Sequence, residues 1–161
     1  MGRSAAWLVV TAMISAALSG VASAQNTDTG PVQTAAAQFS SDVTWRESTV
    51  LAADFSCAGK VQFAILGGSP KEIVVAIFTE GLGERPALLR FEANAHDIRA
   101  AKIRLDDYSL SAEEITGLSG TAPTGYRPSS NCHGVRLSDQ GIDAAHIYWD
   151  HDHRRFDSWT Q

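Results

Sequence analysis

The residues best suited to chemistry follow one another in a short polar turn near the C-terminus. They are Asp150, His151, Asp152 and His153. Imidazole nitrogens bind zinc and copper, and carboxylates can complete the coordination shell, so these four residues are the candidate metal ligands of the chain. Adjacent residues of a tight turn rarely converge on one ion, however, which favours a solvated turn. We therefore predict no cofactor, with zinc or copper at this turn as the alternative.

Catalytic chemistry has less support in the sequence than metal binding. The chain has no G-x-S-x-G, HExxH or P-loop motif, each of which would imply a mechanism. Adjacent carboxylates occur at residues 106–107 and 113–114, but neighbours on a strand point to opposite faces, which is typical of a solvated surface. We predict no catalytic residues. The alternative is a hydrolase whose residues meet only in the fold, and a pocket joining His96 or His133 to a carboxylate would support it.

The polar turn connects two aromatic segments, and together they predict a β-hairpin over residues 145–159. We expect Asp150 to face Arg155 across the turn, and side chains then alternate between two faces. The face that we assign to the core carries Ile147, Trp149, Phe156 and Ser158. The other face carries His146, Tyr148, Asp150, Arg155, Asp157 and Trp159. Aromatic side chains among charged ones suit a binding surface, so we predict that this second face binds a partner.

A second candidate surface is the segment 125–132, which contains Tyr126 and Arg127. Tyrosine and arginine are frequent interface anchors, and loops on a rigid scaffold often carry function. An equal alternative is that Tyr126 only covers the core. The predicted binding residues of the chain are Tyr126, Arg127, His146, Tyr148, Asp157 and Trp159. From these residues we predict a non-catalytic binding module, such as an inhibitor or an immunity-type protein, whose partner is an envelope protein or a glycan.

The first residues have the pattern of a secretory signal peptide. Arg3 precedes an uncharged apolar run over residues 5–18, and Ala22 and Ala24 form an A-x-A cleavage site. We expect cleavage before Gln25, because the apolar run is too short to span a membrane comfortably; an uncleaved N-terminal anchor is the alternative. The prediction is a protein of the periplasm of a Gram-negative bacterium, or a secreted one, with no transmembrane segment in the mature chain.

Length and charge limit the remaining possibilities. The chain has 161 residues and a net charge of −5, and loss of Arg3 with the signal peptide makes the mature chain more acidic. Acidic balance argues against a nucleic-acid partner and against electrostatic binding to anionic membranes. We assign residues 1–24 to the cleaved signal peptide, 25–42 to a flexible N-terminal segment and 43–161 to a single β-rich domain.

Short apolar segments between Gly-rich turns predict a mainly β, antiparallel domain with one or two short helices. The expected strands lie at residues 50–55, 61–66, 73–79, 87–92, 101–108 and 133–137, and a further strand begins within 43–46. The segment 73–79 is almost wholly apolar, so we expect it to be buried on both faces. A capping box at residues 111–114 starts one helix, and residues 34–39 form one or two helical turns. We expect residues 67–70 to end the strand before them, and residues 116–130 to form a loop.

The two cysteines, Cys57 and Cys132, lie far apart in the sequence. In an oxidising compartment such a pair most simply forms a disulfide. A bridge that closes so long a loop contributes about 4 kcal/mol in the chain-entropy model. A free reactive thiol and half of a metal site are the alternatives.

Residues 54–62 resemble the calcium-loop hairpin of FG-GAP and VCBS-type repeats, which carry D-x-D/N-x-D-G-x-x-D. Asp54 and Gly59 match this pattern, whereas Ala58 and Gln62 replace carboxylates. Calcium needs several hard oxygen ligands, so we expect no calcium here. The resemblance implies an inherited turn shape, stapled by Cys57 in place of the ion; an ordinary glycine turn is the alternative. The chain also resembles small exported bacterial proteins that end in an H-x-Y-W…F-x-x-W hairpin, a resemblance that implies no activity.

Overall fold

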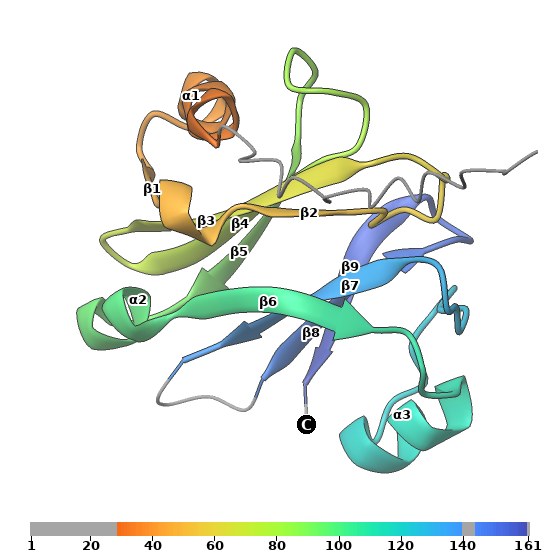
Figure 1. Cartoon of the computed structure of the whole chain (residues 1–161). Coiled ribbons are helices and arrows are strands. Elements are labelled where there is room, and N and C mark those ends of the chain that lie inside the picture. The colour runs from red at the N-terminus through yellow and green to blue at the C-terminus, as the bar shows by residue number, and fades with distance from the viewer. Residues whose placement is uncertain (1–28, 140–143, 161) are drawn as a thin grey trace, which may run out of the picture.

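The computed structural model describes residues 29–139 and 144–160, which fold into two antiparallel β-sheets (Figure 1). The strands are β1 Thr44–Trp45, β2 Leu51–Ala53, β3 Gln62–Ser69, β4 Glu72–Phe78, β5 Ala87–Glu92, β6 Lys102–Asp107, β7 His133–Ser138, β8 Ala145–Asp150 and β9 Arg155–Thr160. The helices are α1 Gly30–Phe39, α2 Ala95–Ala100 and α3 Ala112–Ser119, with a 3-10 turn over Glu47–Thr49. The predicted mainly β, antiparallel fold is confirmed. The predicted signal peptide lies outside the described residues.

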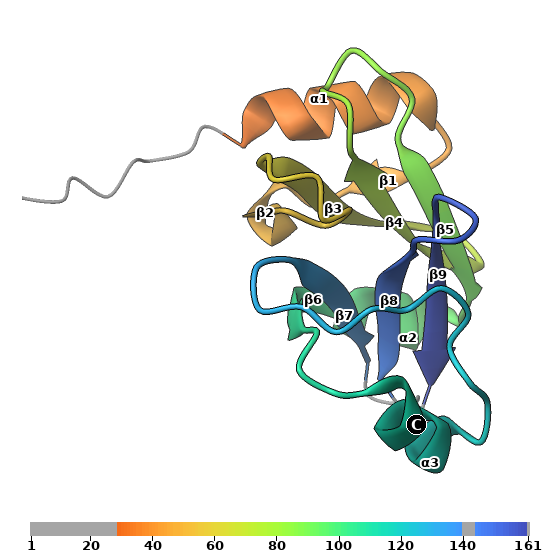
Figure 2. The ribbon, with the colours of Figure 1, turned by 90° about the vertical axis from the view of Figure 1, so that its right-hand side faces the viewer.

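The two sheets have simple orders. The first runs β1-β3-β4-β5, and β2 pairs with the same side of β3 as β1 does; the second runs β6-β7-β8-β9. Figure 2 shows α1 above the first sheet and α3 at the far end of the second. Both sheets end in strands with one free side, and the two end strands β5 and β9 contact one another. No helix of residues 29–139 and 144–160 is long and apolar enough to cross a membrane.

The main core lies between the sheets. Leu66, Val75 and Ile77 of the first sheet pack there with Val135 and Ile147 of the second. A second core lies on the outer side of the first sheet, where residues of β3 and β4 pack against α1. Because β4 is covered on both sides, its residues 73–78 are all buried, as the apolar run predicts.

Strand β3 is longer than the sequence predicts, since it continues through Gly67 and Gly68 to Ser69. A Cβ atom on Gly67 would lie 2.4 Å from Cγ1 of Val43, and one on Gly68 would lie 2.5 Å from Cγ2 of Ile98. The two glycines therefore allow neighbouring side chains to approach the strand closely, rather than breaking it.

Helix α1 occupies much of the segment 25–42, which the sequence analysis treats as flexible. It begins at Gly30 with Pro31 in its first turn, and it buries Val32, Ala35 and Ala36 against the first sheet. These positions follow the i, i+3, i+4 spacing of one helix face. The small alanine side chains gave only a weak apolar signal, which predicted just the last turns of this helix.

The other two helices are fixed by their caps. The capping box predicted at Ser111 is present, because its hydroxyl accepts from the N–H of Glu114 and the Glu114 carboxylate accepts from the N–H of Ser111. Helix α3 therefore extends into the predicted loop and ends at Gly120, which has φ +73°. Helix α2 was not predicted from the sequence, and its first turn is capped by Asn94. Arg46 donates to the carbonyls of Ile98 and Ala101 at the other end of α2.

Candidate functional site

The C-terminal hairpin has the predicted register. Asp150 faces Arg155, and His146 faces Trp159 four pairs further along β8 and β9. The face that we assigned to the core does contain Ile147 and Phe156, which pack between the sheets. The tight polar turn thus sets which side chains of the hairpin share a face.

The opposite face of the hairpin is covered over its β8 half, whereas Arg155 of β9 is exposed and Asp157 and Trp159 are half-buried. His146 is 6% exposed, Tyr148 3% and Asp150 0%. The cover is the segment between α3 and β7, which crosses in front of the second sheet in Figure 2. Its end is tethered by the predicted disulfide between Cys57 and Cys132, which the structure contains.

Tyr126 is part of this cover. Its ring meets those of Tyr108 and Tyr148 edge-on, with centroids 5.4 and 5.6 Å away, and its hydroxyl donates to the carbonyl of Leu110. Burial raises the pKa of Tyr126 to about 12 and that of Tyr148 to about 12. The structure therefore supports the interpretation that Tyr126 covers the core. Arg127 is exposed, and its guanidinium lies 3.4 Å from the carboxylate of Asp152.

His146 supports Trp159 from behind. The two rings are stacked, with centroids 3.9 Å apart and planes inclined by 4°. Nδ1 of His146 lies 2.6 Å from the carboxylate of Asp106, and Nε2 is buried without a hydrogen-bond partner among the described residues. The imidazole is therefore fixed by a carboxylate on one side, and it holds the indole in place by stacking.

The polar turn is organised by the buried carboxylate of Asp150. This carboxylate accepts hydrogen bonds from the N–H groups of Asp152 and His153, and it lies 2.6 Å from Nδ1 of His153. Burial alone would raise its pKa, but the hydrogen bonds from His153 and Asp152 hold the pKa of Asp150 below its usual value. The N–H of His151 donates to the carbonyl of Gly125, which ties the turn to the covering segment.

These contacts leave the predicted metal ligands without a shared centre. Among the residues that the structure describes, no three His, Cys, Asp or Glu side chains are grouped closely enough to hold a metal. Asp150 is occupied by hydrogen bonds within the turn, and Asp152 faces Arg127. Zinc or copper binding at this turn remains the alternative to the prediction of no cofactor.

Three of the predicted binding residues meet at a cleft of about 540 Å³ along the free side of β9. Asp157 and Trp159 line it from β9, and Tyr148 lines it from β8. The opposite wall is formed by Ser119 and residues 121–124, and Phe91 of β5 closes it from the first sheet. A volume of this size suits a small ligand or a few residues of a partner chain. We call this space the β9 cleft.

A second hollow, of about 450 Å³, lies beside the first half of β9. Arg154, Arg155 and Phe156 line it on the hairpin side, and Arg85 lines it from the turn before β5. All three arginines are exposed. Arg155 lies 3.7 Å from the carboxylate of Asp157, whereas Arg85 and Arg154 make no ion pair within the described residues. The two hollows together follow β9 from its cationic start to its aromatic end.

The residues predicted from the sequence do not include Arg85, Arg154 or the wall formed by Ser119 and residues 121–124. Nothing in their local pattern indicates that they meet at one side of β9, because that depends on the order of the strands in both sheets. A larger hollow of about 980 Å³ lies elsewhere, near Asp42 and Glu72. Arg90 pairs with both of these carboxylates, at 3.4 and 2.7 Å, so these two acidic side chains are already engaged.

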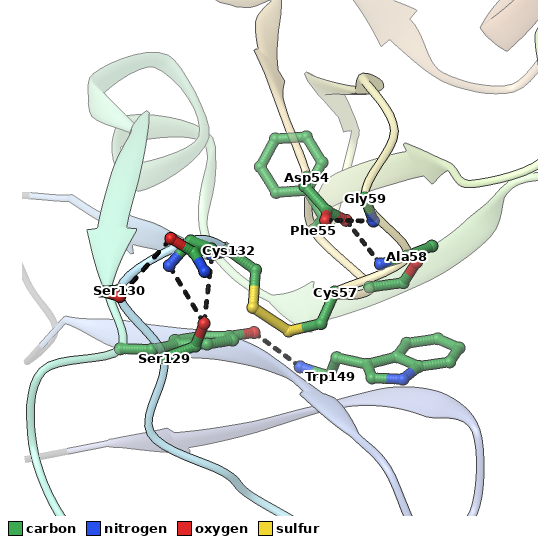
Figure 3. The surroundings of a disulfide bond; sticks show 12 residues. Asp54, Phe55, Cys57, Ala58, Gly59, Ser129, Ser130, Cys132 and Trp149 are labelled. Carbon is green, nitrogen blue, oxygen red and sulfur yellow. Dashed lines mark hydrogen bonds between the residues drawn. A yellow bond between two sulfur atoms is a disulfide. The ribbon is translucent and has the colours of Figure 1, made fainter.

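The disulfide fixes the turn that resembles a calcium loop (Figure 3). The Asp54 carboxylate points into this turn and accepts hydrogen bonds of 2.9 and 2.6 Å from the N–H groups of Ala58 and Gly59. Cys57, at φ +56°, bonds to Cys132, and the N–H of His133 donates to the carbonyl of Asp54. The turn is thus held by one carboxylate and one covalent bridge to the covering segment.

The two hollows beside β9 differ in the contacts that their side chains offer. In the β9 cleft, indole and phenol rings offer apolar contact, and the threonines and Ser158 offer hydroxyl groups. In the second hollow, the arginines offer positive charge. The His133–Asp107 pair, at 3.7 Å, belongs to the other half of the second sheet and does not line the cleft. A comparison of the chain with known protein families, curated proteins and solved structures finds no match.

Proposed function

We propose that this protein is a non-catalytic binding module of the bacterial cell envelope, and that it holds its partner along the free side of β9. The observation that carries the proposal is the pair of hollows beside β9, of which one has Trp159 in its wall and the other has Arg155 and its neighbour Arg154. Aromatic side chains and arginine are the groups that contribute most to binding in protein interfaces.

The rigidity of the cleft supports the same proposal. Trp159 is held by stacking on His146, which in turn is held by Asp106. The opposite wall follows α3 and belongs to the segment that the disulfide tethers. A preformed site loses little conformational entropy when a partner binds, so modest contacts can give useful affinity.

Export of the protein to the periplasm is part of the proposal. A disulfide with a sequence separation of 75 residues is typical of proteins that fold in an oxidising compartment. The signal-peptide pattern at residues 1–24 agrees with it. The partner would then be an envelope protein or a glycan, and an inhibitor or immunity-type role fits a small, rigid binder.

The test uses one substitution that fills the cleft and one matched control. Thr124 is exposed and lines the β9 cleft, so Thr124→Trp should block it without disturbing the core. Val61 is 70% exposed, directly precedes β3 and does not line the cleft, so Val61→Trp adds bulk elsewhere. We expect partners retained from envelope extracts, or on a glycan array, to be lost with Thr124→Trp only. Equal binding by all three proteins would refute the proposed site.

A further inference from the structure

The main-chain groups of β9 identify what kind of partner this site takes. The N–H of Ser158 donates to its neighbour's carboxylate, on Asp157, and not to β8. Two pairs nearer the turn, Trp149 faces Phe156, and the N–H of Trp149 donates to the hydroxyl of Tyr108, away from β9. In an antiparallel ladder, residues that bond to the neighbouring strand alternate with residues that do not. Phe156, Ser158 and Thr160 therefore direct their N–H and C=O groups to the free side of β9.

These outward groups form an open template for another strand. Strand β9 pairs with β8 alone within the described part of the chain, and no other main-chain segment there bonds to its free side. Exposed strand edges are usually covered or shortened, because they pair with other chains. Here two hollows border the edge, one at Arg155 and Phe156 and the other from Asp157 to Thr160.

The walls of the two hollows fit a chain in extended conformation. Side chains of an added strand alternate between the two faces of the sheet. On one face they would meet Phe91 and Phe156, next to the main core. On the other face they would meet Trp159 and residues 121–124. The six residues of β9 offer a length of about 20 Å, at roughly 3.3 Å per residue.

Charge adds a preference at one end. Arg85, Arg154 and Arg155 surround the start of β9 and line the second hollow, which has no acidic side chain among the described residues in its wall; Asp157 lines the β9 cleft. Arg85 and Arg154 have no ion-pair partner in the described residues, so an incoming carboxylate would meet available positive charge. The complementary partner therefore carries an acidic side chain where it lies beside these arginines.

We propose that the partner binds as an extended polypeptide segment, which adds to β9 as a fifth strand of the second sheet and places an acidic residue at the Arg85–Arg154 end. The inference rests on the proposed binding function and specifies its partner. Recognition by strand addition draws affinity from main-chain hydrogen bonds and specificity from the alternate side-chain positions. A glycan would use Trp159 and the hydroxyl groups, but it would leave the row of outward N–H and C=O groups unpaired.

The first test selects random linear peptides displayed on phage against the protein produced from the full chain. The affinity of the selected peptides, as synthetic compounds, is then measured for two variants at one position. Ser158→Pro removes an outward N–H that bonds to no strand, and proline is tolerated at such edge positions. Ser158→Ala keeps that N–H and removes only the hydroxyl. We expect Ser158→Pro to weaken binding by about tenfold or more, and Ser158→Ala to leave it nearly unchanged.

The second test needs no change to the protein. Each main-chain amide of a selected peptide is N-methylated in turn, which removes one donor at a time. In an added strand only alternate amides face β9, so methylation should abolish binding at every second position and be tolerated between them. This pattern decides the question even where Ser158→Pro fails to fold.

Several outcomes would overturn strand addition. Selected peptides that tolerate both Ser158→Pro and methylation at every amide would bind in another way. A dimer in solution that Ser158→Pro dissolves would make a second copy of this chain the occupant. If no peptide is selected, but a glycan binds and is lost with Thr124→Trp, strand addition is wrong while the binding module stands. If neither peptide nor glycan nor envelope protein is retained, both proposals fall.

Discussion

The carboxylate of Asp157 accepts a hydrogen bond of 2.8 Å from the N–H of Ser158, the next residue in β9. The donor belongs to the free edge of the second sheet, so in the unbound protein one outward main-chain group is already satisfied. A main-chain N–H that is shielded from water costs free energy when it has no acceptor. The side chain of Asp157 therefore acts as a local substitute for the neighbouring strand, and a partner strand has to displace it.

Removal of this carboxylate should make the edge more available. We expect Asp157→Ala to bind the selected peptides severalfold more tightly than the wild type, because the competing charged acceptor is gone. Asp157→Asn is the matched control, since it keeps an acceptor oxygen and should change affinity less. Calorimetric titration gives both values. Weaker peptide binding by Asp157→Ala would show that Asp157 contacts the partner directly.

The hairpin turn and the covering segment should depend on one glycine. A Cβ atom on Gly125 would lie 1.8 Å from Oδ1 of Asp150 and 2.9 Å from the N–H nitrogen of Asp152, and the residue has φ +63°. We expect Gly125→Ala to lower the free energy of unfolding by about 3 kcal/mol, because both a strained backbone and a displaced buried carboxylate result. Urea denaturation measures this change.

Gly59→Ala is the control for backbone strain alone. Gly59 has φ +72°, similar to that of Gly125, but nothing lies within 4 Å of the position of its Cβ. Its substitution should therefore cost only about 1 kcal/mol. Equal losses in the two variants would mean that the approach of Gly125 to Asp150 does not matter for stability.

The three tyrosines give a pH prediction for the covered face. The chain contains three tyrosines, Tyr108, Tyr126 and Tyr148, and burial raises the pKa of each. Below the ordinary pKa of 10.0 the tyrosines are protonated in both the folded and the unfolded state, so the free energy of unfolding has its full value. As the pH rises from about 10 toward about 12, the unfolded chain ionises first and the free energy of unfolding falls.

Absorbance of tyrosinate measures this directly, without a variant. In urea the protein should titrate near the ordinary tyrosine pKa of about 10. In buffer, tyrosinate should form only at clearly higher pH, together with loss of the folded state. A folded protein that titrates like the unfolded chain would place these rings in water and would contradict the covered face.

Much of the hairpin could be predicted from sequence because its determinants are local. Alternation of side chains has a period of two, and the polar turn between Asp150 and Arg155 fixes the register, so pairs as distant as His146 and Trp159 follow. The capping box at Ser111 is equally local, since both of its hydrogen bonds lie within four residues. The burial of β4 on both faces is predictable because a strand that is buried on both faces needs apolar side chains at every position.

The exposure of the hairpin could not be predicted in the same way. Whether His146 and Tyr148 face water depends on residues 108–132. The disulfide holds the end of this segment in place, and its tyrosines pack against Tyr148. That β9 ends its sheet, and that Arg85 lies beside it, follow from the order of all nine strands. Periodicity contains no information on that order, so the sequence could not indicate that the edge of the hairpin is bordered by two hollows.

A metal titration tests the polar turn. With the Asp150 carboxylate engaged by Asp152 and His153, we expect zinc and copper to give the same weak heats with the wild type as with the His151→Ala/His153→Ala variant. Asp150 and His153 could coordinate an ion only after three hydrogen bonds within the turn are broken, and this cost lowers the affinity for the ion. Stoichiometric binding that the double variant loses would instead make the turn a metal site.

The cationic end of β9 should select for acidic partners. Arg85→Glu reverses one charge beside the start of the strand, and Arg85 forms no ion pair within the described residues, so the fold should tolerate the change. Arg104→Glu makes the same change at an exposed position of β6, on the far side of the second sheet. We expect acidic selected peptides to lose about tenfold in affinity with Arg85→Glu and little with Arg104→Glu, because the loss comes from a nearby charge and not from net charge. Added salt should reduce this difference, since these charges are exposed and screened. Equal losses in both variants would mean that only the net charge matters, and the acidic preference at this end would then be wrong.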